Sequence, residues 1–338
     1  MKRVLITNAV PSDIIAPLEG MAEVILGPGN GDLMLREEVL RLGPTLHGII
    51  NQAELQVDAE LLDHCPRLRV VANIAVGTDN LNGELMGRRG IWATNTPGVY
   101  CQATADLTLA FLLCLSRRIL RADAFVRSGK WDKFQPGVWD GDLLEGRTLG
   151  IVGYGRIGQA VARRARAFGM NIVYHSRSTL NEPDHRSLDA LLQESDYVSL
   201  HVPLNPETLG LMNRTRFGQM KRGAYFLNMA RGKLVVEEAL VTALECGHLA
   251  GAALDVFEDE PKVHPKLLNL PNVVLAPHIG GGTYQSRRAA RCLAVDNVVR
   301  VLRGDSPITP INQPAFEIQP PLTNHASHTH HGQIHPPG

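Results

Sequence analysis

Three polar side chains that could do chemistry each follow an apolar segment in the second half of the chain. Arg231 follows 224–228, Glu260 follows 252–256, and His278 follows 273–276. An arginine suits a carboxylate and an adjacent carbonyl oxygen, because its planar fork donates two parallel hydrogen bonds. A histidine oriented by a carboxylate can give a proton to that oxygen or take it back. Singly, these residues could be a solvated loop charge, part of an acidic surface turn and a turn histidine, but together they indicate an acid/base site for an oxo acid.

A glycine pattern halfway along the chain marks a nucleotide site. The apolar run Leu149–Val152 leads into Gly153-Tyr154-Gly155-Arg156-Ile157-Gly158, and an alanine-rich helical segment follows. In this context the glycines allow a tight turn, close approach of backbone to a pyrophosphate and close packing of helix on strand. The alternative is an ordinary glycine-rich turn. We expect a dinucleotide site from about residue 147, and hydride transfer to a 2-oxo acid as the chemistry.

The elements that position these residues alternate between strand and helix. Expected strands are 4–7, 23–26, 48–51, 69–73 and 91–94, then 149–152, 171–174, 197–201, 224–228, 252–256 and 273–276. One long apolar helix, 102–120, would bridge two domains, and another, 284–302, would return to the first. The fold class expected is α/β, with a Rossmann-type doubly wound parallel sheet domain inserted in a smaller flavodoxin-like α/β substrate domain.

The expected domain boundaries follow from these helices. Residues 1–98 with 289–312 form the substrate-binding domain, and 99–288 form the dinucleotide-binding domain. Residues 313–338 are expected to be a flexible tail rich in proline and histidine. Such a tract can bind metals, but a disordered tail with incidental histidines is favoured, and no metal is assigned.

Composition excludes several classes of function. The 34 basic and 34 acidic residues balance, so nothing indicates nucleic acid or an anionic membrane as a partner. A signal peptide and an apolar run of about 18 residues, as a membrane span needs, are both missing. The five cysteines are scattered without a Cys-x-x-Cys pair, which argues against disulfides and structural zinc, although Cys101 could be a catalytic thiol. We expect a soluble cytoplasmic protein.

Five motifs resemble the D-isomer-specific 2-hydroxyacid dehydrogenases, and among them the glyoxylate/hydroxypyruvate reductases most. The resemblance runs from about residue 2 to Asn312. The motifs are Gly153-x-Gly155-x-x-Gly158, His201-Val202-Pro203-Leu204-Asn205-Pro206-Glu207-Thr208, Asn228-x-Ala230-Arg231-Gly232, Asp255-Val256-Phe257-Glu258-x-Glu260-Pro261 and Pro277-His278-Ile279-Gly280.

The resemblance implies roles for particular residues. Arg231, Glu260 and His278 would be the catalytic set, and the backbone amides of Ala75, Val76 and Gly77 would bind the substrate carboxylate. Thr104 would lie near the cofactor and Asp255 would hold its carboxamide, although these two could also be an interface hydroxyl and a turn cap. The other expected cofactor-binding residues are Gly153, Tyr154, Gly155, Arg156, Ile157, Gly158, Ser176, Arg177, Ser178, His201, Val202, Pro203, Thr208, Met229, Ala230, Arg231, His278 and Gly280.

The residues after the second strand of the nucleotide domain bear on the choice of cofactor. Enzymes of this fold that use NAD carry an acidic residue there, which accepts from the ribose hydroxyls. Here Ser176 stands in that position with Arg177 beside it. A 2′-phosphate would not be repelled, and the arginine could hold it. We expect NADP(H) to be preferred with NAD(H) possible, unless Arg177 is only a solvated loop residue.

The function expected is NADPH-dependent reduction of small 2-oxo acids such as glyoxylate and hydroxypyruvate. A bulkier 2-oxo acid remains open, because pocket preferences depend on side-chain positions. The alternative class is a nucleotide-sensing module that resembles the C-terminal-binding corepressors and works by binding partner peptides. The resemblance also implies a homodimer, in which Trp139 either reaches the partner's active site or packs in the interface.

Overall fold

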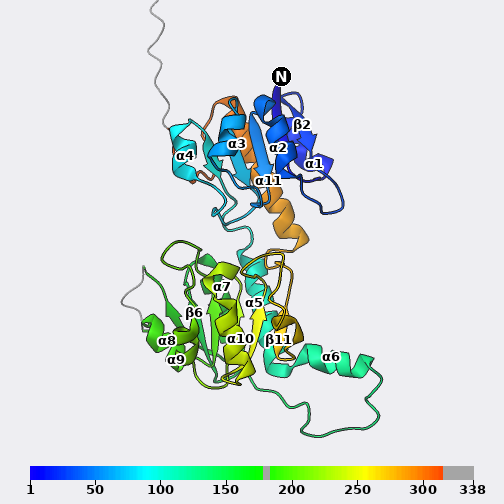
Figure 1. The fold of residues 1–338 in the computed structure, drawn as a ribbon, viewed down its shortest axis with the longest axis vertical. Coiled ribbons are helices and arrows are strands. Elements are labelled where there is room, and N and C mark those ends of the chain that lie inside the picture. Colours follow the sequence, from blue (N-terminus) through cyan, green and yellow to red (C-terminus); the bar gives the residue numbers. More distant parts are fainter. Residues whose placement is uncertain (178–182, 315–338) are drawn as a thin grey trace, which may run out of the picture.

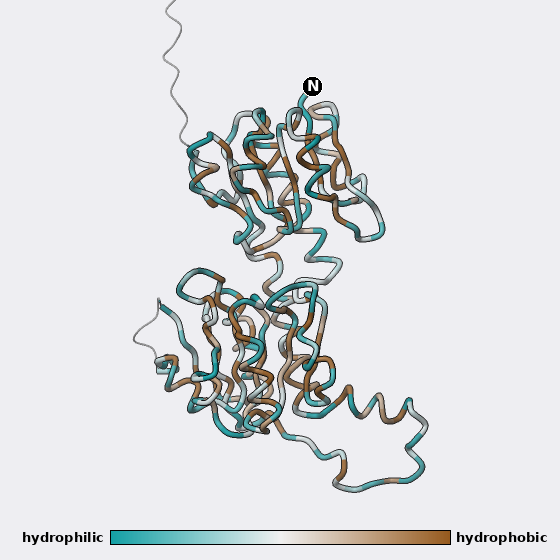
Figure 2. Tube along the Cα trace, in the orientation of Figure 1, coloured by the Kyte–Doolittle hydropathy of each residue, from teal (hydrophilic) through white to brown (hydrophobic). Residues whose placement is uncertain are grey.

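The structure of this protein, a computed structural model, describes residues 1–177 and 183–314. These residues form two lobes, each built around one parallel β-sheet (Figure 1). Apolar stretches run along the strands inside each lobe, whereas the outer loops are mainly hydrophilic (Figure 2). The expected α/β class, with parallel sheets and alternating helices, is confirmed.

The first sheet has five strands in the order β2-β1-β3-β4-β5. Because the order reverses between β1 and β3, this is the flavodoxin-like arrangement. The strands are β1 (Lys2–Ile6), β2 (Ala22–Leu26), β3 (Gly48–Asn51), β4 (Val70–Asn73) and β5 (Trp92–Thr94), and the helices between them are α1 (Ser12–Ile15), α2 (Arg36–Leu42), α3 (Ala59–His64) and α4 (Gly83–Arg88).

Both faces of this sheet are buried, which explains why its strands are continuous apolar runs rather than alternating ones. On β3, Ile49 packs in one apolar cluster with Leu5, and Ile50 packs in the other with Val4. Successive residues of a strand point to opposite faces, so a strand that is covered on both sides needs apolar residues at every position.

The last helix of the chain covers one face of the first sheet. α11 (Tyr284–Arg303) buries Ala290, Ala294 and Val298, at a spacing of four residues, in the cluster on that face. Beyond it, the side chain of Asn312 accepts the N–H of Ala93 at 2.8 Å. The first lobe is therefore built from both ends of the described chain, and α11 appears in the upper lobe of Figure 1.

The second sheet has six strands in the order β11-β10-β9-β8-β6-β7, which reverses between β6 and β8. Helices α5 and α7 cover one face, and α8, α9 and α10 cover the other. The strands are β6 (Thr148–Val152), β7 (Asn171–His175), β8 (Tyr197–Leu200), β9 (Ala224–Asn228), β10 (Leu249–Leu254) and β11 (Val273–Leu275). The helices are α5 (Cys101–Arg117), α6 (Ile119–Arg127), α7 (Arg156–Ala167), α8 (Leu188–Glu194), α9 (Arg214–Gln219) and α10 (Glu237–Glu245).

The long helix expected over 102–120 is wrong at its end. α5 stops at Arg117, and Arg118 adopts a left-handed conformation with φ 52° before α6 begins in a new direction. The chain that returns from α6 donates the Asp142 N–H to the Ser116 carbonyl at 2.9 Å. This tertiary contact occupies a carbonyl in the last turn of α5. The apolar pattern of the sequence continues past Arg117, so it does not reveal where the helix ends.

A second difference concerns β10. The strand expected over 252–256 begins at Leu249 and ends at Leu254, so Asp255 lies directly after the strand instead of inside it. Its side chain is consequently at the carboxyl edge of the sheet, where ligands of parallel sheets bind.

Some expectations concern residues outside the described ranges. Ser178 and the histidine-rich tail from residue 315 onward both belong to this group. Among the helices of 1–177 and 183–314, none combines the length and the apolar character required to cross a bilayer.

The turn between β6 and α7 depends on three glycines for different reasons. Gly153 has φ +100°, which favours glycine, and a Cβ on Gly158 would lie 2.2 Å from the Gly153 carbonyl oxygen. Gly155 precedes α7, and a Cβ there would meet no atom within 4 Å. Gly158 is therefore required for packing of the helix on the strand, whereas Gly155 keeps open the space in front of the helix N-terminus, where an anion binds.

This difference can be tested with two alanine variants. Gly158→Ala should lower the free energy of unfolding by about 1–3 kcal/mol, because the added methyl group overpacks the turn. Gly155→Ala should change it by less than about 0.5 kcal/mol, yet weaken dinucleotide binding about tenfold, or 1.4 kcal/mol. Thermal melts and titration with a reduced nicotinamide dinucleotide measure the two effects. Equal melting temperatures for the two variants would contradict this assignment.

Candidate active site

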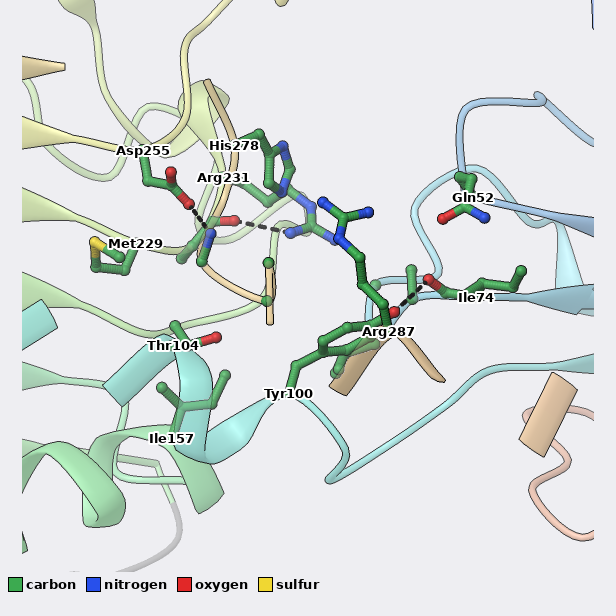
Figure 3. Close-up of a pocket in the computed structure, with 17 residues that line it drawn as sticks. Gln52, Ile74, Tyr100, Thr104, Ile157, Met229, Arg231, Asp255, His278 and Arg287 are labelled. Carbon is green, nitrogen blue, oxygen red and sulfur yellow. Dashed lines mark hydrogen bonds between the residues drawn. The ribbon is translucent and has the colours of Figure 1, made fainter. Parts of the chain in front are cut away.

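A cavity of about 180 Å³ lies between the two lobes (Figure 3). The carboxyl ends of both parallel sheets open onto it. The lining residues are Gln52, Ile74, Ala75, Val76, Gly77, Tyr100, Thr104, Ile157, Met229, Ala230, Arg231, Asp255, His278, Gly280, Gly281, Gly282 and Arg287. A wider cleft of about 690 Å³ adjoins it and is lined by Glu260 together with Arg231 and His278. The three side chains expected to do chemistry are thus brought together.

His278 is held by two contacts. Its Nδ1 lies 2.8 Å from Oε2 of Glu260, and its backbone N–H donates to the Asp255 carbonyl at 2.9 Å. The backbone has φ 53°, a left-handed conformation that costs a non-glycine residue about 1–2 kcal/mol. Because Glu260 occupies Nδ1, Nε2 is the atom left to exchange a proton with a ligand in the cavity.

Glu260 is ionised at neutral pH. Burial raises the pKa of this carboxyl, but the hydrogen bond and charge of His278, with the N–H of Phe257 and the charge of Arg231, outweigh burial. The net pKa therefore lies below its usual value. The carboxylate is therefore negatively charged where it meets Nδ1 of His278, and it can orient the imidazole ring.

Arg231 joins the two lobes. It follows β9 in the second lobe, and its Nε donates to Oδ1 of Asp79 in the first lobe at 3.2 Å. A Cβ on Gly77 would lie 1.6 Å from Nη2 of Arg231, so the guanidinium lies directly against the backbone of the first lobe. Nη1 also donates to the Ala230 carbonyl at 2.8 Å. The arginine is therefore held at the junction where a ligand between the lobes would contact it.

The loop after β4 presents backbone amides to the cavity. The carbonyls of residues 75–77 accept hydrogen bonds from Thr96, Asn95 and Asn73 at 2.9, 2.8 and 3.1 Å. Among the described residues, the N–H groups of 75–77 have no acceptor. With its carbonyls engaged elsewhere, the loop offers a row of free donors, as anion-binding loops do.

Buried asparagines support this loop from below. Asn51 donates to Oδ1 of Asn73 at 3.0 Å, and Asn73 donates to Oδ1 of Asn80 at 2.7 Å. All three are fully or nearly fully buried. Because a buried polar network is stable only when its members are satisfied, these bonds hold the carboxyl ends of β3 and β4 in one geometry.

Asp255 fixes the turn that carries His278. Its two oxygens accept the N–H groups of Ile279 and Gly280, each at 2.7 Å. The bond to Gly280 is the dashed line at Asp255 in Figure 3. Burial raises the pKa of Asp255 more than these two bonds lower it. A Cβ on Gly280 would lie 2.9 Å from Oδ2 of Asp255 and 3.6 Å from Thr104. The contacts make Asp255 a turn-capping residue, and its role toward a carboxamide stays a prediction.

The loop after β8 packs against the glycine turn. A Cβ on Gly153 would lie 2.5 Å from the His201 carbonyl oxygen, and burial lowers the pKa of the His201 imidazole to about 3, so the ring is neutral. Thr208 closes the loop by donating to the Pro203 carbonyl at 2.7 Å. His201 and Val202 are therefore beside the nucleotide turn, and the other two expected residues, Pro203 and Thr208, follow in the same loop.

The residues after β7 carry an unexpected contact. Arg177 pairs with Glu207 at 2.9 Å, and both side chains are about three-quarters exposed. Tyr154 of the glycine turn stacks on Tyr174 of β7, with ring centroids 3.8 Å apart. Ser176 accepts a hydrogen bond from Nε2 of His185 at its carbonyl, at 3.1 Å. The arginine expected to hold a phosphate is thus already bonded to a carboxylate.

Six lining residues were not among the site residues expected from the sequence, namely Gln52, Ile74, Tyr100, Gly281, Gly282 and Arg287. Gln52 directly follows β3, so extending the strand-end argument to the first lobe would have found it. Tyr100 donates to the Ile74 carbonyl at 3.0 Å. Arg287, on the first turn of α11, points into the cavity beside Arg231 (Figure 3), and its side chain has no partner among the described residues. Nothing in the local pattern distinguishes Arg287 from the solvated arginines next to it.

Cys101 has no features of a nucleophile. It is buried in the first turn of α5 and does not line the cavity. Burial raises the pKa of its thiol, which disfavours the reactive thiolate. The interpretation as a small core residue is favoured over that of a catalytic thiol.

Comparisons with known proteins agree with this geometry. Residues 109–280 match the family model for the NAD binding domain of D-isomer specific 2-hydroxyacid dehydrogenases. A glyoxylate reductase of Thermococcus kodakarensis is 44% identical over 329 residues, covering 94% of this chain and 98% of the relative. A solved structure from Thermus thermophilus is 46% identical with TM-score 0.87, covering 91% and 99% of the two chains.

One further solved structure includes a nucleotide. It is an NADPH-dependent glyoxylate/hydroxypyruvate reductase from Sinorhizobium meliloti in complex with NADP and malonate, 33% identical with TM-score 0.79, covering 92% and 96% of the two chains. The open space at Gly155 before α7 fits the pyrophosphate of such a cofactor. On this evidence the chain belongs to the D-isomer-specific 2-hydroxyacid dehydrogenase family and is an NAD(P)-dependent oxidoreductase.

Proposed function

We propose that this protein reduces small 2-oxo acids, glyoxylate and hydroxypyruvate among them, to 2-hydroxy acids with NADPH as the preferred hydride donor. The observation that carries the proposal is the convergence of the His278–Glu260 pair, Arg231 and the free amides of 75–77 on one cavity between the lobes. Glyoxylate reductases of several archaea are about 40% identical over nearly the full chain, which supports the substrate class.

Substrate binding follows from the charges in the cavity. The free N–H groups of 75–77 receive the carboxylate of the oxo acid, and the Arg231 guanidinium donates to that carboxylate and to the adjacent carbonyl oxygen. Arg287 adds a second positive charge beside Arg231. These groups draw electron density toward the carbonyl oxygen and leave its carbon more electrophilic.

The proton is supplied by His278. Its Nε2 donates to the carbonyl oxygen as that oxygen gains charge, and Glu260 at Nδ1 stabilises the imidazolium before transfer. A bound reduced nicotinamide supplies the hydride to the carbonyl carbon. In the reverse direction neutral His278 takes the hydroxyl proton. His278 and Glu260 lie between the two lobes, and closure of the lobes over a ligand excludes water from the pair.

The cofactor preference rests on the residues after β7. In that position NAD-dependent enzymes have a carboxylate that accepts from the ribose hydroxyls, and here Ser176 and Arg177 stand instead. A guanidinium favours a 2′-phosphate. The Sinorhizobium reductase with bound NADP belongs to the same fold and family, which supports this preference.

A homodimer is proposed on the basis of the arm formed by α6 and residues 128–143. The arm extends away from the second lobe (Figures 1 and 2), and several of its large apolar side chains are exposed. Trp139 packs on Phe125 within it, with ring centroids 5.0 Å apart. The exposed apolar residues are Ile119, Leu120, Val126, Trp131, Phe134, Val138 and Leu143. Several exposed large apolar side chains on one segment are typical of an interface.

A reducing compartment such as the cytoplasm suits the thiols of this protein. All five cysteines are free, and Cys65 and Cys101 are buried. Free buried thiols are common in proteins of the cytosol, where disulfides are rare.

The first test is absorbance loss of NADPH and of NADH with glyoxylate, hydroxypyruvate, pyruvate, phenylpyruvate and 2-oxoisocaproate. We expect fast oxidation of NADPH with the small polar acids and slower oxidation of NADH. His278→Ala should lower turnover about 100-fold or more while NADPH binding is nearly unchanged, because a general acid contributes that much. Tight NADPH binding without turnover of any acid would favour the nucleotide-sensing alternative, and an active His278→Ala would refute the proton-donor role.

Arg287→Met should raise the KM for the oxo acid about tenfold, as loss of a hydrogen bond to a charged group does. The matched control is Arg288→Met, since Arg288 is the next residue on α11 and pairs with Asp13 outside the cavity. Steady-state kinetics with glyoxylate and a direct titration of NADPH separate the substrate effect from the cofactor effect. A KM equal to that of the control would remove Arg287 from substrate binding.

A further inference from the structure

The Arg177–Glu207 pair crosses the edge of the sheet at the nucleotide turn. Arg177 follows β7 and Glu207 lies on the loop after β8, and β6 runs between these two strands. Neighbouring strands are about 4.8 Å apart, so the pair spans about 10 Å over the end of β6. The glycine turn Gly153–Gly158 begins at that end. A dinucleotide bound at this turn must contact the pair or pass beside it.

The loop that carries Glu207 is rigidly built. Oδ1 of Asn205 accepts the N–H groups of Glu207 and Thr208 at 2.9 and 3.0 Å, and Thr208 in turn bonds the Pro203 carbonyl. The backbone of Glu207 is therefore fixed, whereas its side chain is 73% exposed. An exposed pair of this kind contributes little to folding stability, so its position is not explained by stability.

We propose that Glu207 is a cofactor-specificity residue that competes with the 2′-phosphate of NADPH for the Arg177 guanidinium. The inference rests on the proposed role of Arg177 in NADPH preference. A carboxylate and a phosphate use the same donors of the planar fork, so the two anions compete for the same guanidinium. NADPH must displace Glu207 to reach Arg177, whereas NADH, which lacks the phosphate, leaves the pair intact.

The consequence is a weaker preference for NADPH over NADH. Glu207 weakens NADPH binding without affecting NADH, so the protein retains use of both cofactors although the usual ribose-binding carboxylate is missing after β7. Glu207 therefore acts indirectly. It occupies the Arg177 guanidinium and does not contact the cofactor in the NADPH complex.

A double-mutant cycle with direct binding tests the inference. The variants are Glu207→Gln, Arg177→Gln and their combination, and the probes are NADPH, NADH, 2′,5′-ADP and 5′-AMP, titrated by calorimetry. Glu207→Gln should tighten NADPH and 2′,5′-ADP about 3- to 10-fold, a shift of the size that removing one nearby exposed charge produces. NADH and 5′-AMP should stay within about twofold. In the Arg177→Gln background, the Glu207→Gln substitution should change NADPH affinity by no more than about twofold.

A matched control has the same change of net charge elsewhere on the second lobe. Glu245→Gln qualifies, because Glu245 ends α10 and pairs with Lys266 at 3.1 Å. Its cofactor affinities should equal those of the unmodified protein. Thermal melts of all variants confirm that they fold, which is expected since both side chains of the Arg177–Glu207 pair are exposed.

The remaining outcomes distinguish the two proposals. If Arg177→Gln leaves the ratio of NADPH to NADH affinity unchanged, the proposed role of Arg177 in NADPH preference is wrong. The proposed competition by Glu207 is then wrong as well. If Arg177→Gln weakens NADPH but Glu207→Gln does not tighten it, the competition alone is overturned. Weaker NADH binding by Glu207→Gln would make Glu207 a ribose contact and would also overturn the inference.

Discussion

Two parallel sheets that meet at their carboxyl edges are the constraint on which the candidate site depends. Residues after β3 and β4 of the first lobe and after β9, β10 and β11 of the second line one cavity. Arg231 makes the physical connection, because its guanidinium bonds Asp79 and lies against Gly77 across the junction. That contact lies in the cavity that both the His278 turn and the loop 75–77 line.

The backbone that carries the site has a conformation that costs free energy to form. His278 has a left-handed conformation, and the turn behind it is bonded by a buried carboxylate, Asp255, whose oxygens accept two backbone N–H groups. Strain of this kind persists only where surrounding contacts enforce it. Under the loop after β4 in the first lobe, the hydrogen bonds among the buried Asn51, Asn73 and Asn80 likewise hold the backbone in one geometry. Both walls of the cavity therefore keep their geometry before any ligand binds.

The nucleotide end is organised differently from the acid/base end. The His278 and Glu260 side chains are partly exposed, but the backbone of His278 is held by the buried Asp255. Arg177 and Glu207 are about three-quarters exposed and are joined to each other. A fixed backbone suits chemistry that tolerates one geometry, and an exposed ion pair suits a contact that must open. Family membership is compatible with either cofactor, and the proposed competition assigns the difference between them to this surface pair.

Much of this could be read from the chain itself. The apolar runs, the glycine turn and the strand-end residues Arg231 and His278 predicted the α/β class and the position of the glycine turn, and they predicted which side chains would meet at one edge, because local patterns specify strands and parallel strands bring their carboxyl ends together. Other features are nonlocal. α5 ends at Arg117 because Asp142 caps it, Arg287 faces the cavity because α11 crosses to the other lobe, and Glu207 meets Arg177 across β6. Each of these joins residues distant in sequence, or on different elements, through packing. Only the tertiary structure decides them, because no local periodicity encodes which side chains of separate elements will meet.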